Sequence, residues 1–199
     1  MIRPIYLLGS DELRAPTTAV ERDSEDVQRL IGDLIDTMHD ASGIGLAAPQ
    51  LGQSVRIFVV DVTPMERDFE EDGIEMPSQP MIFIDAQIVD KTEEDEEFEE
   101  GCLSIPDIHE NVIRPGGIKI EYLDRSFKKR NEVFEGILAR VIQHEYDHIE
   151  GVLFIDHLSA FKRRLLKRKL DDIRNGVTEA DYPVYTLETG IIQPAPDTA

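Results

Sequence analysis

The sequence predicts an α+β domain. Its 199 residues suit one folded unit that buries about two-thirds of the surface of the unfolded chain. Hydrophobic periodicity indicates elements in the order helix, several strands, helix and helix, which is typical of strands and helices in separate layers. The chain has no internal repeat and no apolar run near 18 residues, so a repeat array and a membrane-spanning helix are excluded.

The first elements are a helix and a buried strand. Asp23 or Ser24 suits the N-cap of a helix over about 25–40, in which apolar side chains recur at helical spacing. Gly43 ends that pattern. Residues 55–62 are rich in Val, Ile and Phe and predict a buried strand.

The middle of the chain predicts a long loop and further strands. Residues 64–80 combine three prolines with many charges, which indicates a loop. Strands are expected over 81–89 and 118–122, with a short one at 133–134. The acidic run at 93–100 predicts a solvated, partly mobile segment.

Two helices and a tail complete the chain. A buried helix is expected from Ile137 to Ile149, where Gly151 would end it. An amphipathic helix is expected over 159–174, with five apolar side chains mainly inward: Phe161, Leu165, Leu166, Leu170 and Ile173. We expect residues 1–175 to form a single domain and residues 176–199 to form a partly disordered tail.

Charge is distributed unevenly. Of the formal −20, residues 66–100 contribute −13, from fifteen acidic residues against two basic ones. Residues 162–174 carry seven basic residues against two acidic ones, a net +5. The overall charge argues against binding of free nucleic acid. The basic segment is consistent either with a solvated helix face or with a docking surface.

The single cysteine and the amino-terminal residues predict the cellular compartment of the protein. One Cys excludes an intrachain disulfide and fits a reducing environment. The apolar stretch within residues 1–8 is too short for a signal peptide. We therefore expect a cytoplasmic protein that does not associate with membranes.

The sharpest motif is His144-Glu145-Tyr146-Asp147-His148 in the predicted buried helix. Residues i and i+4 lie on one face of a helix, so both imidazoles can reach one metal ion. Glu145 points about 100° away and can instead contact a water molecule at the metal, as a general base must. A surface helix with two histidines is the alternative, but two unpartnered buried histidines would be costly.

A catalytic site of this kind usually has three protein ligands and one open position. Local candidates fail, because Phe154 stands where one protease class has a third His, His157 comes three residues too late, and the 159–174 helix contains no Glu. Cys102 is therefore a candidate for the third ligand, since a metal ion deprotonates a thiol and binds it tightly. A lone Cys is more often a small buried hydrophobe.

Three segments together resemble the peptide deformylase family: Gly43-Ile44-Gly45-Leu46-Ala47-Ala48-Pro49-Gln50, Glu100-Gly101-Cys102-Leu103-Ser104 and His144-Glu145-Tyr146-Asp147-His148. They occur in the family's order, and the resemblance covers roughly residues 1–170. The first segment also fits a dinucleotide-binding fingerprint superficially. That motif requires a strand before it and a helix after it, whereas here a helix precedes and Pro49 and a strand follow.

The resemblance implies mainly antiparallel sheets packed around a central helix that carries the His-Glu-x-x-His motif. It also implies removal of the formyl group from the N-terminal methionine of newly made proteins, with release of formate. Cys102, His144 and His148 would hold the metal, and Glu145 would be the acid and base. Gln50 and the Leu103 backbone N–H would stabilise negative charge on the formyl oxygen.

Substrate binding is likewise implied by the resemblance. Ile44 and Gly45 would pair with the substrate backbone in strand fashion. The methionine side chain would enter an apolar pocket formed by Ile44, Val141 and Ile137, with Phe98 a weaker candidate, although these aliphatic residues would suit an ordinary core equally well. Glu100 would pair with Arg114 beside this pocket.

One divalent metal ion per chain is expected. A thiolate and two imidazoles suit Zn²⁺, Fe²⁺, Co²⁺ or Ni²⁺. The family commonly uses iron, so Fe²⁺ is the expected native ion and the others are replacements. The expected partners are N-formyl-methionyl nascent peptides. The family's carboxy-terminal helix can dock on the ribosome, which is one interpretation of the basic segment at 162–174.

Two rival functions stay open at this point. A zinc peptidase would use His144, Glu145 and His148 with another third ligand, so Cys102 would be dispensable. A non-enzymatic metal module would need neither Glu145 nor Gln50.

Overall fold

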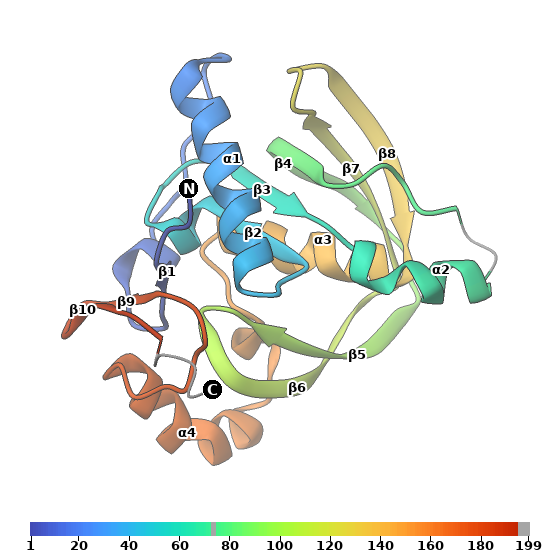
Figure 1. Ribbon diagram of the computed structural model, residues 1–199. Helices are drawn as coiled ribbons and strands as arrows, with labels where there is room; N and C mark the ends of the chain where they lie inside the picture. Colours follow the sequence, from blue (N-terminus) through green and yellow to red (C-terminus); the bar gives the residue numbers. More distant parts are fainter. Residues whose placement is uncertain (73–74, 195–199) are drawn as a thin grey trace.

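The computed structural model describes residues 1–72 and 75–194, and its antiparallel sheets and few helices confirm the α+β class. The main sheet has the order β2-β3-β4-β7-β8, and each neighbouring pair is antiparallel (Figure 1). Its strands are β2 (Gly45–Ala47), β3 (Ile57–Val60), β4 (Met81–Lys91), β7 (Gly117–Leu123) and β8 (Lys129–Glu135). The strands expected at 55–62, 81–89, 118–122 and 133–134 are therefore confirmed, and the last is longer than predicted.

Helices cover both faces of this sheet, and alternate side chains of β3 pack against one face or the other. Ile57 and Val59 point into one core cluster with helix α1 (Glu25–Asp40). Phe58 and Val60 point into a second cluster with helix α3 (Gly136–Ile149). Helix α1 begins as expected at Ser24, whose side chain accepts a hydrogen bond from the Val27 backbone.

Helix α3 lies between the main sheet and a second, two-stranded sheet. It contacts β2, β3, β7 and β8 of the main sheet. On its other side, the Arg140 guanidinium donates to the Val112 and Glu96 carbonyls of the two-stranded sheet. The helix ends at Ile149, and Gly151 follows with φ of 72°, a left-handed conformation that favours glycine.

The two-stranded sheet corrects the prediction for the acidic run. Residues 93–100 were expected to be solvated and partly mobile, but β5 (Asp95–Cys102) pairs along its length with β6 (Ile105–Pro115). Backbone hydrogen bonds stabilise this ribbon, while Phe98 and Glu100 turn inward and the intervening acids face solvent. The strand β6 was not predicted.

Two further expectations were wrong in part. The predicted loop at 64–80 contains a 3-10 turn, Thr63–Met65, and helix α2 (Glu66–Asp72), which buries Phe69; residues 73–74 of that loop lie outside the described part. Helix α4 (Ala160–Arg174) buries Leu170 and Ile173, but Phe161 and Leu165 are 71% and 69% exposed. Only a narrow stripe of α4 packs against the core.

The two ends of the chain meet in a third sheet of order β1-β9-β10. In it, β1 (Ile5–Tyr6) runs parallel to β9 (Val184–Thr186), which is antiparallel to β10 (Gly190–Ile192). The division into a domain over 1–175 and a tail over 176–199 stays a prediction, and residues 195–199 of that tail lie outside the described part. None of the helices in the described residues is long and apolar enough to cross a membrane.

Candidate metal centre

Helix α3 and the end of β5 bring three metal-binding side chains together. The candidate ligand atoms of Cys102, His144 and His148 all lie within 4.8 Å of one another. His144 and His148 are one helical turn apart, and their ring centroids are 5.2 Å apart. Cys102 closes the triangle, with its Sγ 3.3 Å from His148 Nε2.

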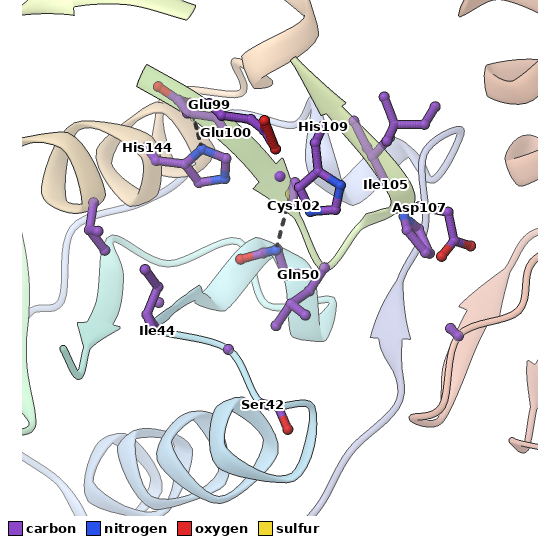
Figure 2. Close-up of a pocket in the computed structure, with 18 of the residues that line it drawn as sticks. Ser42, Ile44, Gln50, Glu99, Glu100, Cys102, Ile105, Asp107, His109 and His144 are labelled. Atoms are coloured by element: carbon purple, nitrogen blue, oxygen red, sulfur yellow. Dashed lines mark hydrogen bonds and ion pairs between the residues drawn. The ribbon is translucent and has the colours of Figure 1, made fainter. Parts of the chain in front are cut away.

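Two of these side chains, Cys102 and His144, border a cavity of about 610 Å³. Figure 2 shows Gln50, Cys102, Glu100 and His144 gathered on one part of its wall, with Ile44 on another. Glu145 also lines the cavity, and its Oε2 is buried without a hydrogen-bond partner among the described residues. A buried carboxylate oxygen is costly to leave unpaired, so it indicates a ligand or water in this space.

Gln50 lies beside the metal ligands and is held from both ends of its amide. The backbone N–H of Ala47 donates to Gln50 Oε1 at 2.8 Å, which fixes the orientation of the amide. The Nε2 group then faces Ser104 Oγ at 3.2 Å and Cys102 Sγ at 3.7 Å. The amide donor is thus directed toward the thiol side of the cavity.

Glu100 organises the wall behind His144. Its carboxylate accepts from Arg114 Nε at 2.7 Å and Nη2 at 3.0 Å, from Arg140 Nη1 at 2.8 Å, and from His144 Nδ1 at 2.9 Å. The last bond leaves His144 Nε2 free to face Cys102, which is the arrangement that orients a metal-binding imidazole. The expected ion pair between Glu100 and Arg114 is present.

Asp147 supplies the second carboxylate beside the buried arginines behind His144. It accepts from Arg114 Nη1 at 2.6 Å and from His157 Nε2 at 2.7 Å. Two buried guanidinium groups, of Arg114 and Arg140, are thereby matched by the carboxylates of Glu100 and Asp147. His157, which fails as a metal ligand on spacing, acts in this ion-pair network instead.

Burial and neighbouring charges shift the pKa values of these groups. Burial raises the pKa of Glu145 to about 7, partly opposed by His144. Burial also opposes ionisation of Glu100, but hydrogen bonds from His144 and Arg114 prevail and hold its pKa well below the usual range. Burial lowers the pKa of His148, and the charge of His144 adds to this effect. For His144, contacts with Cys102 and Glu100 outweigh burial and raise the pKa.

The side chains expected to bind substrate lie around the same cavity. The cavity is lined by Ile44, Gly45, Ile137 and Val141. Gly45 lets the Glu145 carboxylate lie close to the backbone of β2, because a Cβ added at Gly45 would collide with that carboxylate. Phe98 instead lies under the Arg140 guanidinium, 5.1 Å from the ring centroid. Strand β2 is an edge strand of the main sheet, so one side of its backbone is open to pairing.

Three contributors escaped the sequence analysis. Arg140 had a signal, since an Arg four residues before His144 in a buried helix requires a carboxylate partner. Ser104 stands in the second motif segment, but no role was predicted for it, and Tyr182 had no signal. Ser104 meets Gln50, and Tyr182 lines the cavity from a part of the chain where no periodicity is evident.

The donor set fits a divalent transition-metal ion. One thiol and two imidazoles can supply three ligands, and Glu145, whose Oε2 has no hydrogen-bond partner among the described residues, lines the adjoining cavity. An α+β fold with a Cys-His-His site on a His-Glu-x-x-His helix defines a class of metallohydrolase.

The comparisons identify the family within that class. The family model described as polypeptide deformylase matches residues 2–164, and the chain belongs to this family. A peptide deformylase of Salinibacter ruber is 51% identical over 188 residues, covering 94% of this chain and 96% of the relative. One from Flavobacterium johnsoniae is 45% identical over 185 residues, covering 92% and 94%.

Solved structures agree in fold. The crystal structure of a peptide deformylase from Legionella pneumophila superposes with a TM-score of 0.77 at 39% identity, covering 88% of this chain and 96% of that one. The enzyme from Synechococcus elongatus in complex with actinonin gives 0.74 at 34% identity, covering 85% of both chains.

Proposed function

We propose that this protein is a metal-dependent hydrolase that removes the formyl group from the N-terminal formyl-methionine of newly synthesised proteins and releases formate. The observation that carries the proposal is the convergence of Cys102, His144 and His148 within 4.8 Å, together with a buried carboxylate oxygen of Glu145 that has no hydrogen-bond partner in the described part of the chain. Membership of the polypeptide deformylase family supports it.

Cys102, His144 and His148 would hold one divalent ion. Such an ion, when bound, would supply Lewis acidity that polarises the formyl carbonyl and acidifies a water molecule. Glu145 would accept a proton from the attacking water and deliver it to the methionine nitrogen as the formyl C–N bond breaks. Formate and a free amino terminus are then the products.

Gln50 and Leu103 would act on the charge that develops during attack. The Gln50 amide and the Leu103 backbone N–H would donate hydrogen bonds to the formyl oxygen as it becomes negative. Donors held in place before the reaction stabilise such charge most effectively. The bond from Ala47 N–H to Gln50 Oε1 supports this role, because it fixes which end of the amide faces the cavity.

The substrate backbone would add to the open edge of β2, at Ile44 and Gly45. The methionine side chain would lie against Ile44, Ile137 and Val141, which line the cavity. Glu100 would act beside this pocket by orienting His144. We also propose that α3 is the central scaffold of the fold, supported by its contacts with the main sheet and with the β5–β6 ribbon.

Formate release from a formyl-methionyl peptide, with and without a chelator, tests the activity. Glu145→Gln should keep the metal and lose most turnover, because the proton acceptor is removed while the ligands stay. Glu150→Gln is the matched control at the C-cap of the same helix, since Glu150 pairs with Arg56 and does not line the cavity. Full activity of Glu145→Gln would contradict the assignment.

Cys102→Ser separates the proposal from a zinc peptidase. The deformylase function predicts loss of metal or collapse of formate release, because a ligand is removed. A peptidase with another third ligand would retain its metal and cleave internal peptide bonds. The distance of 3.3 Å between Cys102 Sγ and His148 Nε2 favours the first outcome.

We propose Fe²⁺ as the native ion, with Zn²⁺, Ni²⁺ or Co²⁺ as replacements. A thiolate and two imidazoles suit all four, and Fe²⁺ beside a thiolate should be sensitive to oxygen. Anaerobic purification followed by metal analysis tests this. Equal activity before and after exposure to air would count against iron. The free Cys102 supports a reducing compartment, and we propose a cytoplasmic location.

We further propose that residues 1–175 are the catalytic domain and that α4 docks on the ribosome. Exposed Phe161 and Leu165 beside seven basic residues support docking through α4. Co-sedimentation with ribosomes should be lost when Arg163, Arg164 and Lys167 are reversed in charge. Reversal of Lys128 and Lys129, at the β7–β8 turn, is the control. Absence of salt-dependent binding would refute docking and leave a solvated helix face.

A further inference from the structure

The turn between β5 and β6 is held by both ends of the chain. Cys102 ends β5, Leu103 and Ser104 form the turn, and Ile105 begins β6. The Tyr182 hydroxyl donates to the Leu103 carbonyl at 2.8 Å. The Leu8 backbone N–H donates to the Ser104 carbonyl at 2.9 Å. Two consecutive carbonyls of the turn are thus bound by segments that lie more than seventy residues away on either side.

These two donors are themselves joined. Leu8 follows β1 and Tyr182 precedes β9, and these strands pair in parallel. Backbone bonds from Ile5 N–H to the Pro183 carbonyl and from Leu7 N–H to the Tyr185 carbonyl, both 2.9 Å, flank that pairing. The turn is therefore fixed by a small hydrogen-bonded unit rather than by one flexible side chain.

Tyr182 is well suited to this contact. Its side chain is largely buried, with the residue 6% exposed, and its hydroxyl is bound to the Leu103 carbonyl. Burial raises its pKa, and the charge of Cys102 acts in the same direction, so the hydroxyl keeps its proton at neutral pH. It also lines the cavity beside Cys102 and Leu103.

Other contacts hold the remaining sides of the turn. Gln50 Nε2 is 3.2 Å from Ser104 Oγ. The Leu103 side chain packs so closely on Gly43 that a Cβ added there would lie 2.7 Å from Leu103 Cδ1. The Leu103 N–H lies in the peptide plane shared with Cys102, which pairs with Ile105 at the end of β5, and the Leu103 carbonyl lies in the next plane. Because Cys102 is paired on one side of the Leu103 Cα and the Leu103 side chain and carbonyl are held on the other, the N–H has little freedom to turn.

We propose that Tyr182 is a positioning residue for the active site: by binding the Leu103 carbonyl it holds the Leu103 N–H in the direction needed to stabilise the developing oxyanion. The inference rests on the proposed deformylase function. Tyr182 lies beyond residues 2–164, the part that the family model matches, so the family motifs do not assign it this role. A misdirected donor reduces stabilisation of the transition state more than it reduces binding of the substrate, because the negative charge on the formyl oxygen develops only in the transition state.

Tyr182→Phe removes one oxygen atom and tests the proposal. We expect kcat for a formyl-methionyl peptide to fall about fivefold, the effect of losing one hydrogen bond, with KM and metal content unchanged. Tyr185→Phe is the matched control, because the Tyr185 ring packs on Tyr6 instead. Replacing Tyr182 by p-aminophenylalanine restores a donor and should recover most of the kcat.

Hydrogen exchange supplies a readout that does not depend on activity. Amides in residues 102–105 should exchange about fivefold faster in Tyr182→Phe than in the wild type or in Tyr185→Phe, because the turn opens more often. Unchanged exchange, or unchanged kcat beside an active wild type, would refute the role of Tyr182 alone. Absence of formate release by the wild-type protein would instead refute the proposed function, and this inference with it.

Discussion

Replacing Glu100 by Gln should weaken both the fold and metal binding. The carboxylate accepts four hydrogen bonds, two on each oxygen: Oε1 from Arg114 and Arg140, and Oε2 from Arg114 and His144. A Gln amide presents one oxygen and one NH₂ group. Whichever way it turns, its NH₂ group faces two donors and both bonds are lost.

The charge change adds to this effect. Arg114 and Arg140 are each 4% exposed. Without Glu100, Arg114 would keep Asp147, whereas Arg140 would keep only backbone carbonyls among the described residues. Removing one partner of a buried ion pair costs about 3–5 kcal/mol. For a chain of this size that corresponds to a fall of about 1–2 M in the urea midpoint. Loss of the Glu100–His144 bond should also lower metal affinity about 10- to 100-fold.

Two measurements check this prediction. Urea unfolding of the chelator-treated protein, followed by circular dichroism, gives the stability change without a contribution from metal. Competition with a chromophoric chelator gives the affinity. Glu97→Gln is the matched control, since it makes the same charge change on the exposed face of the same strand. The reasoning is wrong if Glu100→Gln unfolds within about 0.5 kcal/mol of Glu97→Gln and binds metal equally well.

Three further predictions follow from other contacts. Gly45→Ala should reduce formate release about 100-fold without loss of metal, because the new methyl group displaces the Glu145 carboxylate; wild-type turnover would contradict this. Burial opposes ionisation of Asp61, but hydrogen bonds from Thr63 and His39 prevail and lower its pKa below the unfolded value, so its stabilising effect is present above about pH 4 and lost at lower pH. Asp61→Asn should therefore have a smaller difference between its urea midpoints at pH 7 and pH 3 than the wild type. An unchanged difference would refute the contribution of Asp61 to the pH dependence of stability. Removing a metal present at about 100 times its Kd should lower stability by ~2.7 kcal/mol and the Tm by about 5–10 °C, and an unchanged Tm would mean that the site binds no ion under those conditions.

Features of this protein that depend on local geometry could be predicted from its sequence. The spacing of His144 and His148 places both imidazoles on one helical face, whatever the rest of the fold does. Apolar periodicity predicted α1 and α3, and the start of α1 was predicted at Asp23 or Ser24, of which the structure uses Ser24. Both signals are local because helix periodicity and capping involve residues within one or two turns. Cys102 was a candidate third ligand because the residues that follow the His144–His148 motif fail on spacing, and that argument needs no knowledge of the fold.

Features that depend on partners distant in sequence became evident only in the folded structure. The acidic run became β5 because its backbone pairs with β6, and that pairing turns Glu100 toward two guanidinium groups on other elements. Phe161 stays exposed because α4 packs through a narrow stripe. Tyr182 reaches Leu103 because β9 pairs with β1 at the other end of the chain. Such contacts leave no local periodicity, since the residues that satisfy each buried group are brought together only when the chain folds.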